Sequence, residues 1–320
     1  MTAAIGHDQA WTEWRDALAG PRLHHGWILS GRRGIGKAGF ALAAARELVA
    51  VPGGQMPGAH PDIVVLEPLP ANPDEEKKRD EGRPYLRKRS IGVEQVRAMQ
   101  SRLTTRPTLG PRRAIIIDAA DDLERSAANA LLKSLEEPPV GTHFLLVAHR
   151  LGGLLPTIRS RCRILHFRPL TAAQIDAVLH QAAPEASAEE RAAAIAAAAG
   201  SPGVALDFVS LDLAAMHALM VEIAGTGDPD LSRRGRLGEA MGARPERRRQ
   251  LAAIDLARAI VAERLRDTPR GQLPVLADTH ARLVQLGAEA PTFNFDPGLL
   301  VLEIGGLLAR IADPRDQRHG

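Results

Sequence analysis

A glycine-rich segment near the N-terminus constrains the fold of this chain more than any other feature. Residues 31–37 follow the pattern G-x-x-x-x-G-K, with an apolar, strand-like run at 27–29 before them and a helix-prone stretch at 39–51 after them. Glycines let the backbone wrap a phosphate, while backbone amides, the helix N-terminus and the lysine attract its charge. The strand–loop–helix order therefore predicts a phosphate-binding loop on an α/β sheet. The candidate binding residues are Gly31, Gly34, Gly36 and Lys37.

The same loop lacks groups that ATP hydrolysis needs. The residue after Lys37 is normally Ser or Thr, whose hydroxyl ligates magnesium, but here it is Ala38. An apolar run at 114–117 ends in Asp118, where such proteins carry a magnesium-binding carboxylate. The next residue polarises the attacking water in active ATPases of this type, and here it is Ala119. The two losses together should cost on the order of several kcal/mol of transition-state stabilisation. We expect Asp118 to lie near the loop and expect no ATP hydrolysis by the chain itself.

Nucleotide binding is a separate question, and two alternatives stay open. Lys37 and the glycines can hold the phosphates of ATP or ADP weakly, or they can persist only as a tight turn between a strand and a helix. The incomplete magnesium coordination favours the second alternative, so we expect that no cofactor is required.

Short apolar runs alternate with helix-like stretches in the first half of the chain, a pattern typical of a parallel sheet buried on both faces. We expect strands at residues 27–30, 63–66, 114–117, 144–148 and 163–167. We expect helices at residues 39–51, 93–104, 126–136 and 155–160. The segment 70–90 has almost no apolar content, which predicts a long exposed or disordered loop.

Strand-like runs cease after residue 169, and the rest of the chain predicts helices separated by Gly and Pro. The expected helices include 171–181, 188–199, 251–265 and 297–311. Thr171 is the candidate cap of the first, because its hydroxyl can accept a bond from an unpaired backbone amide. The sequence therefore predicts an α/β domain at 1–168, a small helical domain at 169–209 and a helical C-terminal domain at 210–320.

Composition and charge argue against several classes of protein. The formal net charge is only +3 although the pI is about 9.4, which predicts no strong electrostatic steering. The arginine-rich runs at 233–236 and 247–249 predict solvated helix faces, and no basic patch interleaved with aromatics supports direct DNA binding. The one cysteine, Cys162, excludes an internal disulfide framework and predicts a small buried apolar residue. Without a signal peptide or an apolar run of membrane-spanning length, we expect a cytoplasmic protein.

Several motifs in the first half resemble those of bacterial clamp-loader subunits of the AAA+ superfamily. They are NALLKSLEEPP at 129–139 and LPTIRSRC at 155–162, together with HPD at 60–62 and IGVEQVR at 91–97. The resemblance is dense from about residue 23 to residue 170 and thin beyond. It implies an AAA+ α/β domain of P-loop type, a small helical lid domain and an all-helical C-terminal collar domain.

Departures from the family pattern indicate which kind of subunit the chain resembles. Motor subunits carry an intact phosphate loop, an acidic pair after the strand and a four-cysteine zinc module. Residues 51–59, where that module would lie, contain no cysteine, so no zinc is expected. Ala148 and His149 replace a polar sensor residue, and Gly203 stands where active relatives often place an arginine. The chain is therefore most similar to the non-motor, or stator, type of subunit, whose own nucleotide site is degenerate.

The resemblance also implies a role for Arg161 within the triplet Ser160-Arg161-Cys162. In such loaders this arginine crosses a subunit interface and contacts the γ-phosphate of ATP held by the neighbour. Its permanently charged, planar fork suits the negative charge that builds up in phosphoryl transfer. Arg161 is thus the candidate catalytic residue, as an arginine finger acting in trans.

The implied function is to support ATP-driven loading of a sliding clamp onto primed DNA, within a DNA-directed DNA polymerase holoenzyme. The implied partners are motor subunits of the gamma/tau type and a delta-type subunit in a hetero-pentameric ring. Clamp and DNA would be met through the assembled complex, and no membrane is involved. The alternative is a catalytically active clamp-loader-type ATPase subunit, which Lys37 and Asp118 favour and Ala38 and Ala119 oppose.

Overall fold

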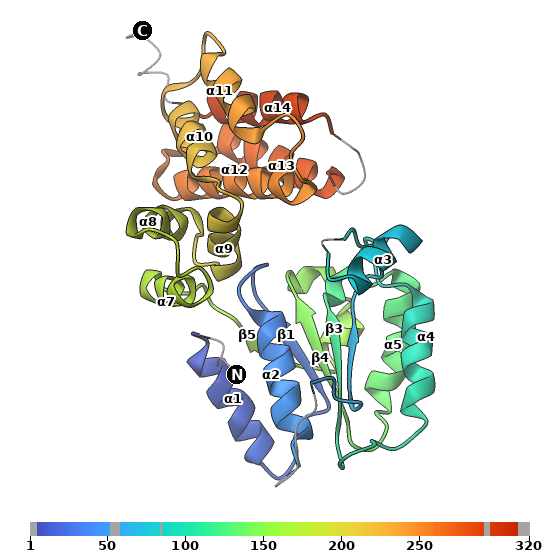
Figure 1. Ribbon diagram of the computed structural model, residues 1–320. Helices are drawn as coiled ribbons and strands as arrows, with labels where there is room; N and C mark the ends of the chain where they lie inside the picture. Colours follow the sequence, from blue (N-terminus) through green and yellow to red (C-terminus); the bar gives the residue numbers. More distant parts are fainter. Residues whose placement is uncertain (1–4, 52–57, 84, 291–294, 313–320) are drawn as a thin grey trace. The chain divides into compact units, whose positions relative to one another are not determined.

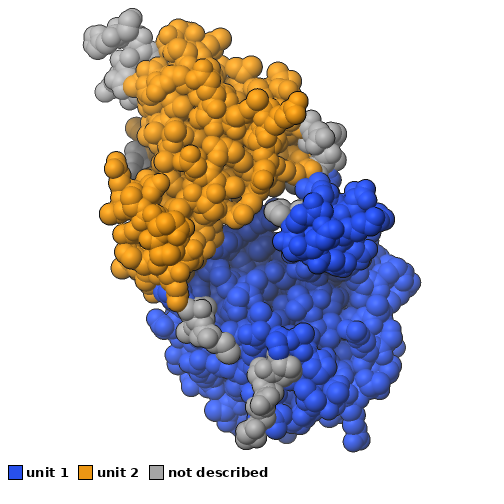
Figure 2. All heavy atoms as spheres, viewed as in Figure 1, with its two compact units in different colours: residues 1–169 blue, residues 170–320 orange. Residues whose placement is uncertain are grey.

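The computed structural model describes residues 5–51, 58–83, 85–290 and 295–312 (Figure 1). The chain divides into two compact units, residues 1–169 and residues 170–320, which Figure 2 shows in different colours. Most of the stretch without cysteine, at 52–57, lies outside the described residues.

The first unit is built on five parallel strands in the order β2-β3-β4-β1-β5. Their bounds are β1 Gly26–Ser30, β2 Ile63–Leu66, β3 Arg113–Asp118, β4 Thr142–Ala148 and β5 Arg163–His166. Every expected strand is confirmed, with ends that differ by at most two residues. The inner strands β1, β3 and β4 are buried along nearly their whole length, as expected for a sheet covered on both faces. The α/β class is therefore confirmed.

Helices cover the two faces of this sheet (Figure 1). Their bounds are α1 Asp8–Ala19, α2 Lys37–Val49, α3 Pro73–Asp80, α4 Val93–Leu103, α5 Arg125–Glu136 and α6 Pro156–Arg159. Alternate strand residues face opposite sides. Ile115 and Phe144 belong to a core with buried residues of α4 and α5. Trp27 contacts Trp14 of α1, with ring centroids 5.5 Å apart. Helix α1 was not among the expected elements, and its tryptophans complete the core on that face.

The expected loop at 70–90 is wrong, because α3 lies within it. The Asn72 side chain caps this helix by accepting a 3.0 Å hydrogen bond from the Glu75 amide. Acidic residues fill the first turn and basic residues the last, which suits the helix dipole. Glu75 is buried and also accepts a 2.6 Å bond from the Leu86 amide, which ties the helix to the returning chain. Charge order and capping stabilise this helix, whereas the expectation relied on apolar content.

The described part of the second unit contains only helices. Their bounds are α7 Ala172–Ala182, α8 Ala188–Ala197, α9 Pro202–Ser210, α10 Ala214–Thr226, α11 Ser232–Met241, α12 Arg247–Asp267, α13 Leu273–Glu289 and α14 Pro297–Ala309. Thr171 caps α7 as predicted: its hydroxyl accepts from the Gln174 amide at 3.3 Å, and the Gln174 side chain accepts from the Thr171 amide at 3.0 Å. Both α7–α9 and α10–α14 fall in this one unit, so the separate lid and collar domains stay a prediction.

Several arginines of the runs at 233–236 and 247–249 connect helices, which corrects the expectation that these runs form only solvated faces. Arg236 and Arg248 are exposed as expected. Arg234 of α11 pairs with the buried Asp228 carboxylate at 3.1 Å, and its side chain crosses α14 at Gly305. A Cβ at Gly305 would lie 2.7 Å from Cγ of Arg234, so glycine lets the two helices pack closely. Arg249 of α12 likewise donates to the Ala240 carbonyl at 2.8 Å.

The described residues include no single helix that is long and apolar enough to cross a membrane. By length and composition alone, α9 and α10 would pass as a pair, but they are bent by 111°.

Candidate functional site

The glycine-rich loop joins the end of β1 to the start of α2 (Figure 1). Gly31 lies against the chain that leaves β5, and a Cβ there would be 2.7 Å from the Phe167 carbonyl oxygen. Gly34 and Gly36 have φ values of +74° and +102°, which strain any residue with a side chain. All three glycines are therefore needed for the turn itself, with or without a bound phosphate.

Lys37 makes its hydrogen bonds inside the loop. Its Nζ donates to the carbonyl oxygens of Gly31 and Arg32, both at 2.6 Å, and lies 3.1 Å from Nδ1 of His149. The side chain is only 3% exposed, and burial lowers its pKa to about 8, against the opposing charges of Asp121 and Asp118. The ammonium group thus has three partners without any phosphate.

Asp118 ends β3 at the carboxyl edge of the sheet, the edge where the loop leaves β1. Its register partner is Val147, next to Ala148, which pairs with Ser30 just before the loop. Burial raises the pKa of the Asp118 carboxyl, with Lys37 opposing. Ala119, the next residue, is buried and apolar. Asp118 therefore lies at the edge where the sequence predicts it.

Residues at this edge differ from those that would ligate magnesium in an active phosphate-binding site. Ala38 is exposed on the first turn of α2 and offers a methyl group where a hydroxyl would ligate magnesium. No group of three or more His, Cys, Asp or Glu side chains suited to a metal ion occurs within the described ranges. Asp118 is the carboxylate that the sequence assigns to magnesium, while the nearby Asp121 accepts from the His149 amide.

His149 directly follows β4, at the position where the sequence predicts a lost sensor residue, and its ring contacts the loop lysine. Its backbone amide donates to Oδ1 of Asp121 at 3.0 Å, which fixes the residue after the strand. Because protonated Lys37 can only donate, Nδ1 of His149 accepts and its proton resides on Nε2. Burial and the charge of Lys37 lower the pKa of His149 to about 4. The sequence identified His149 as a lost sensor, but not as a partner of Lys37.

His7 contacts the loop from the N-terminal side, and the sequence offered no signal for it. Its Nε2 donates to the Ile35 carbonyl oxygen at 2.7 Å, and its ring packs edge-on against Phe167 with centroids 4.7 Å apart. Burial lowers the pKa of His7, so the neutral ring is favoured. His7, His149 and Phe167 thus contact the loop from different sides.

Arg161 lies between α6 and β5, and its side chain contacts α6, the turn after it and the end of α5. Its Nη1 donates to the Thr157 carbonyl at 3.0 Å and to the Ser160 hydroxyl at 3.3 Å. Its Nη2 lies 2.7 Å from Oε1 of Glu136, the last residue of α5. The Arg161 side chain remains 34% exposed, so it can still meet a group from outside.

The sheet places Arg161 and the phosphate loop at opposite ends of its strands. β1 and β5 run parallel, with Trp27 beside Arg163, so Arg161 lies where β1 begins and Gly31 lies where β1 ends. The Arg161 carbonyl oxygen is 3.3 Å from where a Cβ on Gly26 would be. Because a strand rises about 3.3 Å per residue, β1 separates these two ends by about 15 Å. The structure therefore does not bring Arg161 together with Lys37 and Asp118.

Cys162 and Gly203, also singled out from the sequence, both have defined packing or capping surroundings. Burial raises the pKa of the Cys162 thiol to about 12, and its Sγ lies 2.9 Å from where a Cβ on Gly26 would be. This thiol is therefore inert packing at neutral pH. Gly203 lies in the first turn of α9. The Ser201 hydroxyl, just before this turn, caps the helix by accepting a hydrogen bond from the Val204 amide.

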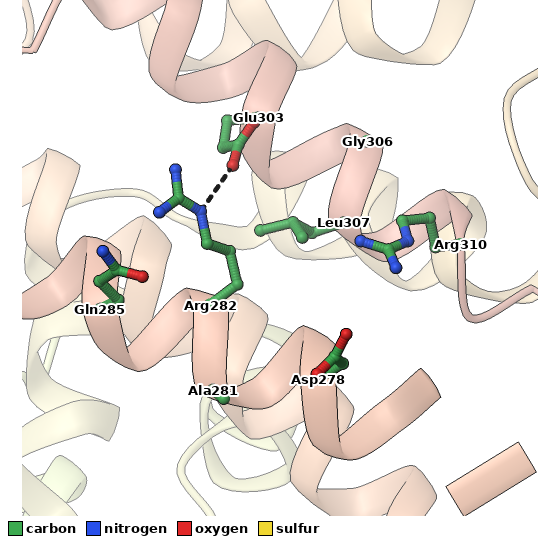
Figure 3. Close-up of a pocket in the computed structure, with 8 residues that line it drawn as sticks. All are labelled: Asp278, Ala281, Arg282, Gln285, Glu303, Gly306, Leu307 and Arg310. Carbon is green, nitrogen blue, oxygen red and sulfur yellow. Dashed lines mark hydrogen bonds and ion pairs between the residues drawn. The ribbon is translucent and has the colours of Figure 1, made fainter. Parts of the chain in front are cut away.

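A separate open groove lies between α13 and α14 in the second unit (Figure 3). Its volume is about 580 Å³, and Arg282 bridges it by a 3.1 Å ion pair to Glu303. Asp278 and Arg310 also line it (Figure 3). The groove contains none of the residues that the sequence identified as candidates.

Comparison with known proteins places these features in a family. The family model described as "DNA polymerase III, delta subunit" matches residues 6–171, more than half of the chain. The DNA polymerase III subunit delta' of Pseudomonas aeruginosa is 34% identical over 208 residues, which cover 59% of this chain and 58% of that protein. The DNA polymerase III subunit tau/gamma of Haemophilus influenzae is 31% identical over 177 residues, covering 53% of this chain and 24% of that protein. The matches thus span 58% of the length of the first of these relatives and 24% of the second.

Solved structures agree with the fold. A gamma subunit-related protein of DNA polymerase III from Thermotoga maritima aligns over 94% of this chain and 99% of its own, with 17% identity and a TM-score of 0.50. This similarity supports the expected AAA+ α/β fold with helices at the C-terminal end. On the family match and the relatives together, the chain belongs to the delta-prime subunits of DNA polymerase III, an AAA+ family of clamp-loader subunits.

Proposed function

We propose that this chain is a non-motor, or stator, subunit of the clamp loader and supplies Arg161 in trans as an arginine finger. The observation that carries the proposal is the position of Arg161, at the opposite end of the strands from its own phosphate loop. An arginine side chain is shorter than a strand, so Arg161 cannot reach a phosphate on Lys37 of the same chain. It remains partly exposed and available to a phosphate held by a neighbour.

The phosphate loop is, in this proposal, degenerate and mainly structural. Lys37 is already satisfied by two carbonyls and His149, while Ala38 and Ala119 lack the polar groups of a working site. Nucleotide binding would have to break these internal bonds and proceed with few metal ligands. The subunit therefore needs no cofactor, binds ATP or ADP at most weakly and has no zinc.

The partners in this proposal are other clamp-loader subunits in a hetero-oligomer. Motor subunits of the gamma/tau type and a delta-type subunit would complete a ring of five, as the family resemblance implies. The neighbour that receives Arg161 must be a motor subunit, since only such a subunit holds ATP productively. Contact with the sliding clamp and primed DNA would occur through the assembled ring.

The helices α10–α14 would form the collar, and the α13–α14 groove is the surface best suited to a neighbouring subunit's helical domain. Leu299 and Leu302 beside it on α14 are 68% and 45% exposed, although large apolar side chains are usually buried. Asp278 and Arg310 add charges of both signs to the groove. An apolar stripe with a mixed polar rim is typical of protein interfaces.

ATP turnover separates this proposal from the alternative of an active ATPase subunit. The isolated chain should show no turnover above background, whereas an active subunit would hydrolyse ATP on its own. In a reconstituted loader, Arg161→Ala should abolish turnover at the site that Arg161 faces. Arg159→Ala removes an exposed arginine two residues earlier, at the end of α6, and serves as the matched control. Robust hydrolysis by the isolated chain would refute the stator role.

A further inference from the structure

Arg161 has an acidic partner that the family match does not assign. Oε1 of Glu136 lies 2.7 Å from Nη2 of Arg161, and the two residues come from different helical segments, α5 and the turn after α6. Nη1 is engaged separately by the Thr157 carbonyl and the Ser160 hydroxyl. The guanidinium group is therefore held from two sides before any neighbour is present.

The bonding pattern leaves defined donors for an external anion. A guanidinium group has five N–H donors. Nη1 donates to Thr157 and Ser160, and Nη2 forms the ion pair with Glu136, whereas Nε has no partner among the described residues. Nε and Nη2 are neighbouring donors on one edge of the planar group. Such an edge binds two oxygens of a phosphate side by side.

The location of Glu136 gives the contact a physical reason. A carboxylate at the C-terminus of a helix faces the negative end of the helix dipole, which is unfavourable unless a cation compensates. Arg161 supplies that cation. His25, just before β1, anchors the same end of α5 through a 2.9 Å bond between its Nε2 and the Leu135 carbonyl. Glu136 is thus fixed relative to the sheet and can fix Arg161 in turn.

We propose that Glu136 is the positioning residue for Arg161: it holds the guanidinium group in one orientation so that the Nε–Nη2 edge is ready for the neighbour's γ-phosphate. The inference rests on the proposed trans role of Arg161 and deepens it. Glu136 does not touch the reacting atoms. It acts by ordering a flexible, rotamer-rich side chain before the transition state forms, which reduces the entropy that the reaction must otherwise lose.

The chain offers a matched control in the next residue. Glu137 carries the same charge, is exposed, and has no ion pair or side-chain hydrogen bond within the described part of the chain. Substitutions at 136 and 137 therefore change the net charge identically. Only the change at 136 removes the contact to Arg161.

The test uses the reconstituted loader with its motor subunits. The readout is the Arg161-dependent ATP turnover, defined as the difference between the wild-type complex and the Arg161→Ala complex. Glu136→Ala should lower the kcat of this component by about three- to tenfold with the KM for ATP within about twofold, because positioning acts on the chemical step. Glu136→Gln keeps an acceptor oxygen and should recover part of the loss. Glu137→Ala should match wild type.

The outcomes distinguish this inference from the proposed trans role of Arg161 on which it rests. If Arg161→Ala lowers turnover but Glu136→Ala behaves like Glu137→Ala, the positioning role is wrong and the trans role stands. If Glu136→Ala raises turnover, Glu136 competes with the phosphate, which also refutes positioning. If Arg161→Ala has no effect, both proposals fail. Melting temperatures of the isolated variants and their incorporation into the complex, both expected to match wild type, show that folding and assembly are intact.

Discussion

Lys37 Nζ lies 3.1 Å from Nδ1 of His149, so the loop lysine is paired with the residue at the sensor position after β4. Two carbonyls of the loop accept its remaining protons at 2.6 Å. In a working phosphate loop the lysine and the sensor both face the phosphates of the nucleotide. Here Lys37 and His149 contact each other, so the lysine has protein partners within the loop itself.

The first prediction concerns the structural role of Lys37. Lys37→Ala leaves two carbonyls and one ring nitrogen without their donor, and should lower the free energy of unfolding of the isolated chain by roughly 1–3 kcal/mol. Urea denaturation measures this change. Lys133→Ala, at an exposed position on α5, should have little effect. A Lys37→Ala chain as stable as wild type would show that the internal bonds contribute nothing.

The second prediction is a pH dependence of stability. The pKa of His149 falls from 6.5 to about 4 on folding, so between these values the unfolded chain binds more protons than the folded one. Stability should therefore decrease as the pH is lowered through this window. The pKa values of His7, His25 and His143 are also lowered by burial and act in the same direction.

His149→Asn removes one of these groups and keeps a polar side chain. The variant should lose less stability than wild type between pH 6.5 and pH 4. Melting temperatures across that range provide the comparison. Parallel curves for the two chains would mean that His149 titrates alike in both states.

The third prediction concerns magnesium. Because Ala38 has no hydroxyl, any ATP binding by the isolated chain should change by less than about twofold when magnesium is added. Ala38→Thr restores a ligand and should make binding magnesium-dependent. Gly39→Ser places a hydroxyl one residue further, where open space surrounds the backbone, and should not. Calorimetric titration distinguishes the three chains, and strong magnesium dependence in wild type would contradict the account.

The fourth prediction concerns packing in the helical unit. A methyl group at Gly305 would meet Cγ of Arg234 at 2.7 Å, whereas one at Gly306 would meet only Nη1 of the same side chain at 3.8 Å. Both substitutions to alanine improve helix propensity by about 1 kcal/mol. Only Gly305→Ala also overpacks the α11–α14 contact, so it should be less stable than Gly306→Ala by roughly 1–3 kcal/mol. Equal stabilities would mean that Arg234 moves aside without cost.

The sequence predicted the sheet well because its strands are short apolar runs between glycines and helices, and burial on both faces imposes that pattern. It failed at α3, where capping by Asn72 and the order of charges stabilise a helix with almost no apolar residues. Local signals of this kind are easily read as disorder when apolar content alone is counted.

The site was predictable only where a motif or a strand end fixed the position. Asp118 and the loop meet because parallel strands share their carboxyl edge. The contacts of His7 and Glu136 depend on tertiary packing across 28 and 25 residues of chain, and no spacing rule predicts them. The separation of Arg161 from its own loop became visible only with the register of β1 and β5.

The most direct test of the central claim is ATP turnover by the reconstituted loader carrying Arg161→Ala in this subunit. Turnover at the facing site should fall by about 10³-fold or more, the usual contribution of an arginine finger, while Arg159→Ala should leave it unchanged. The phosphate release that remains should come from sites that other subunits complete. Equal turnover in the wild-type and Arg161→Ala complexes would contradict the claim that this chain acts at its neighbour's site.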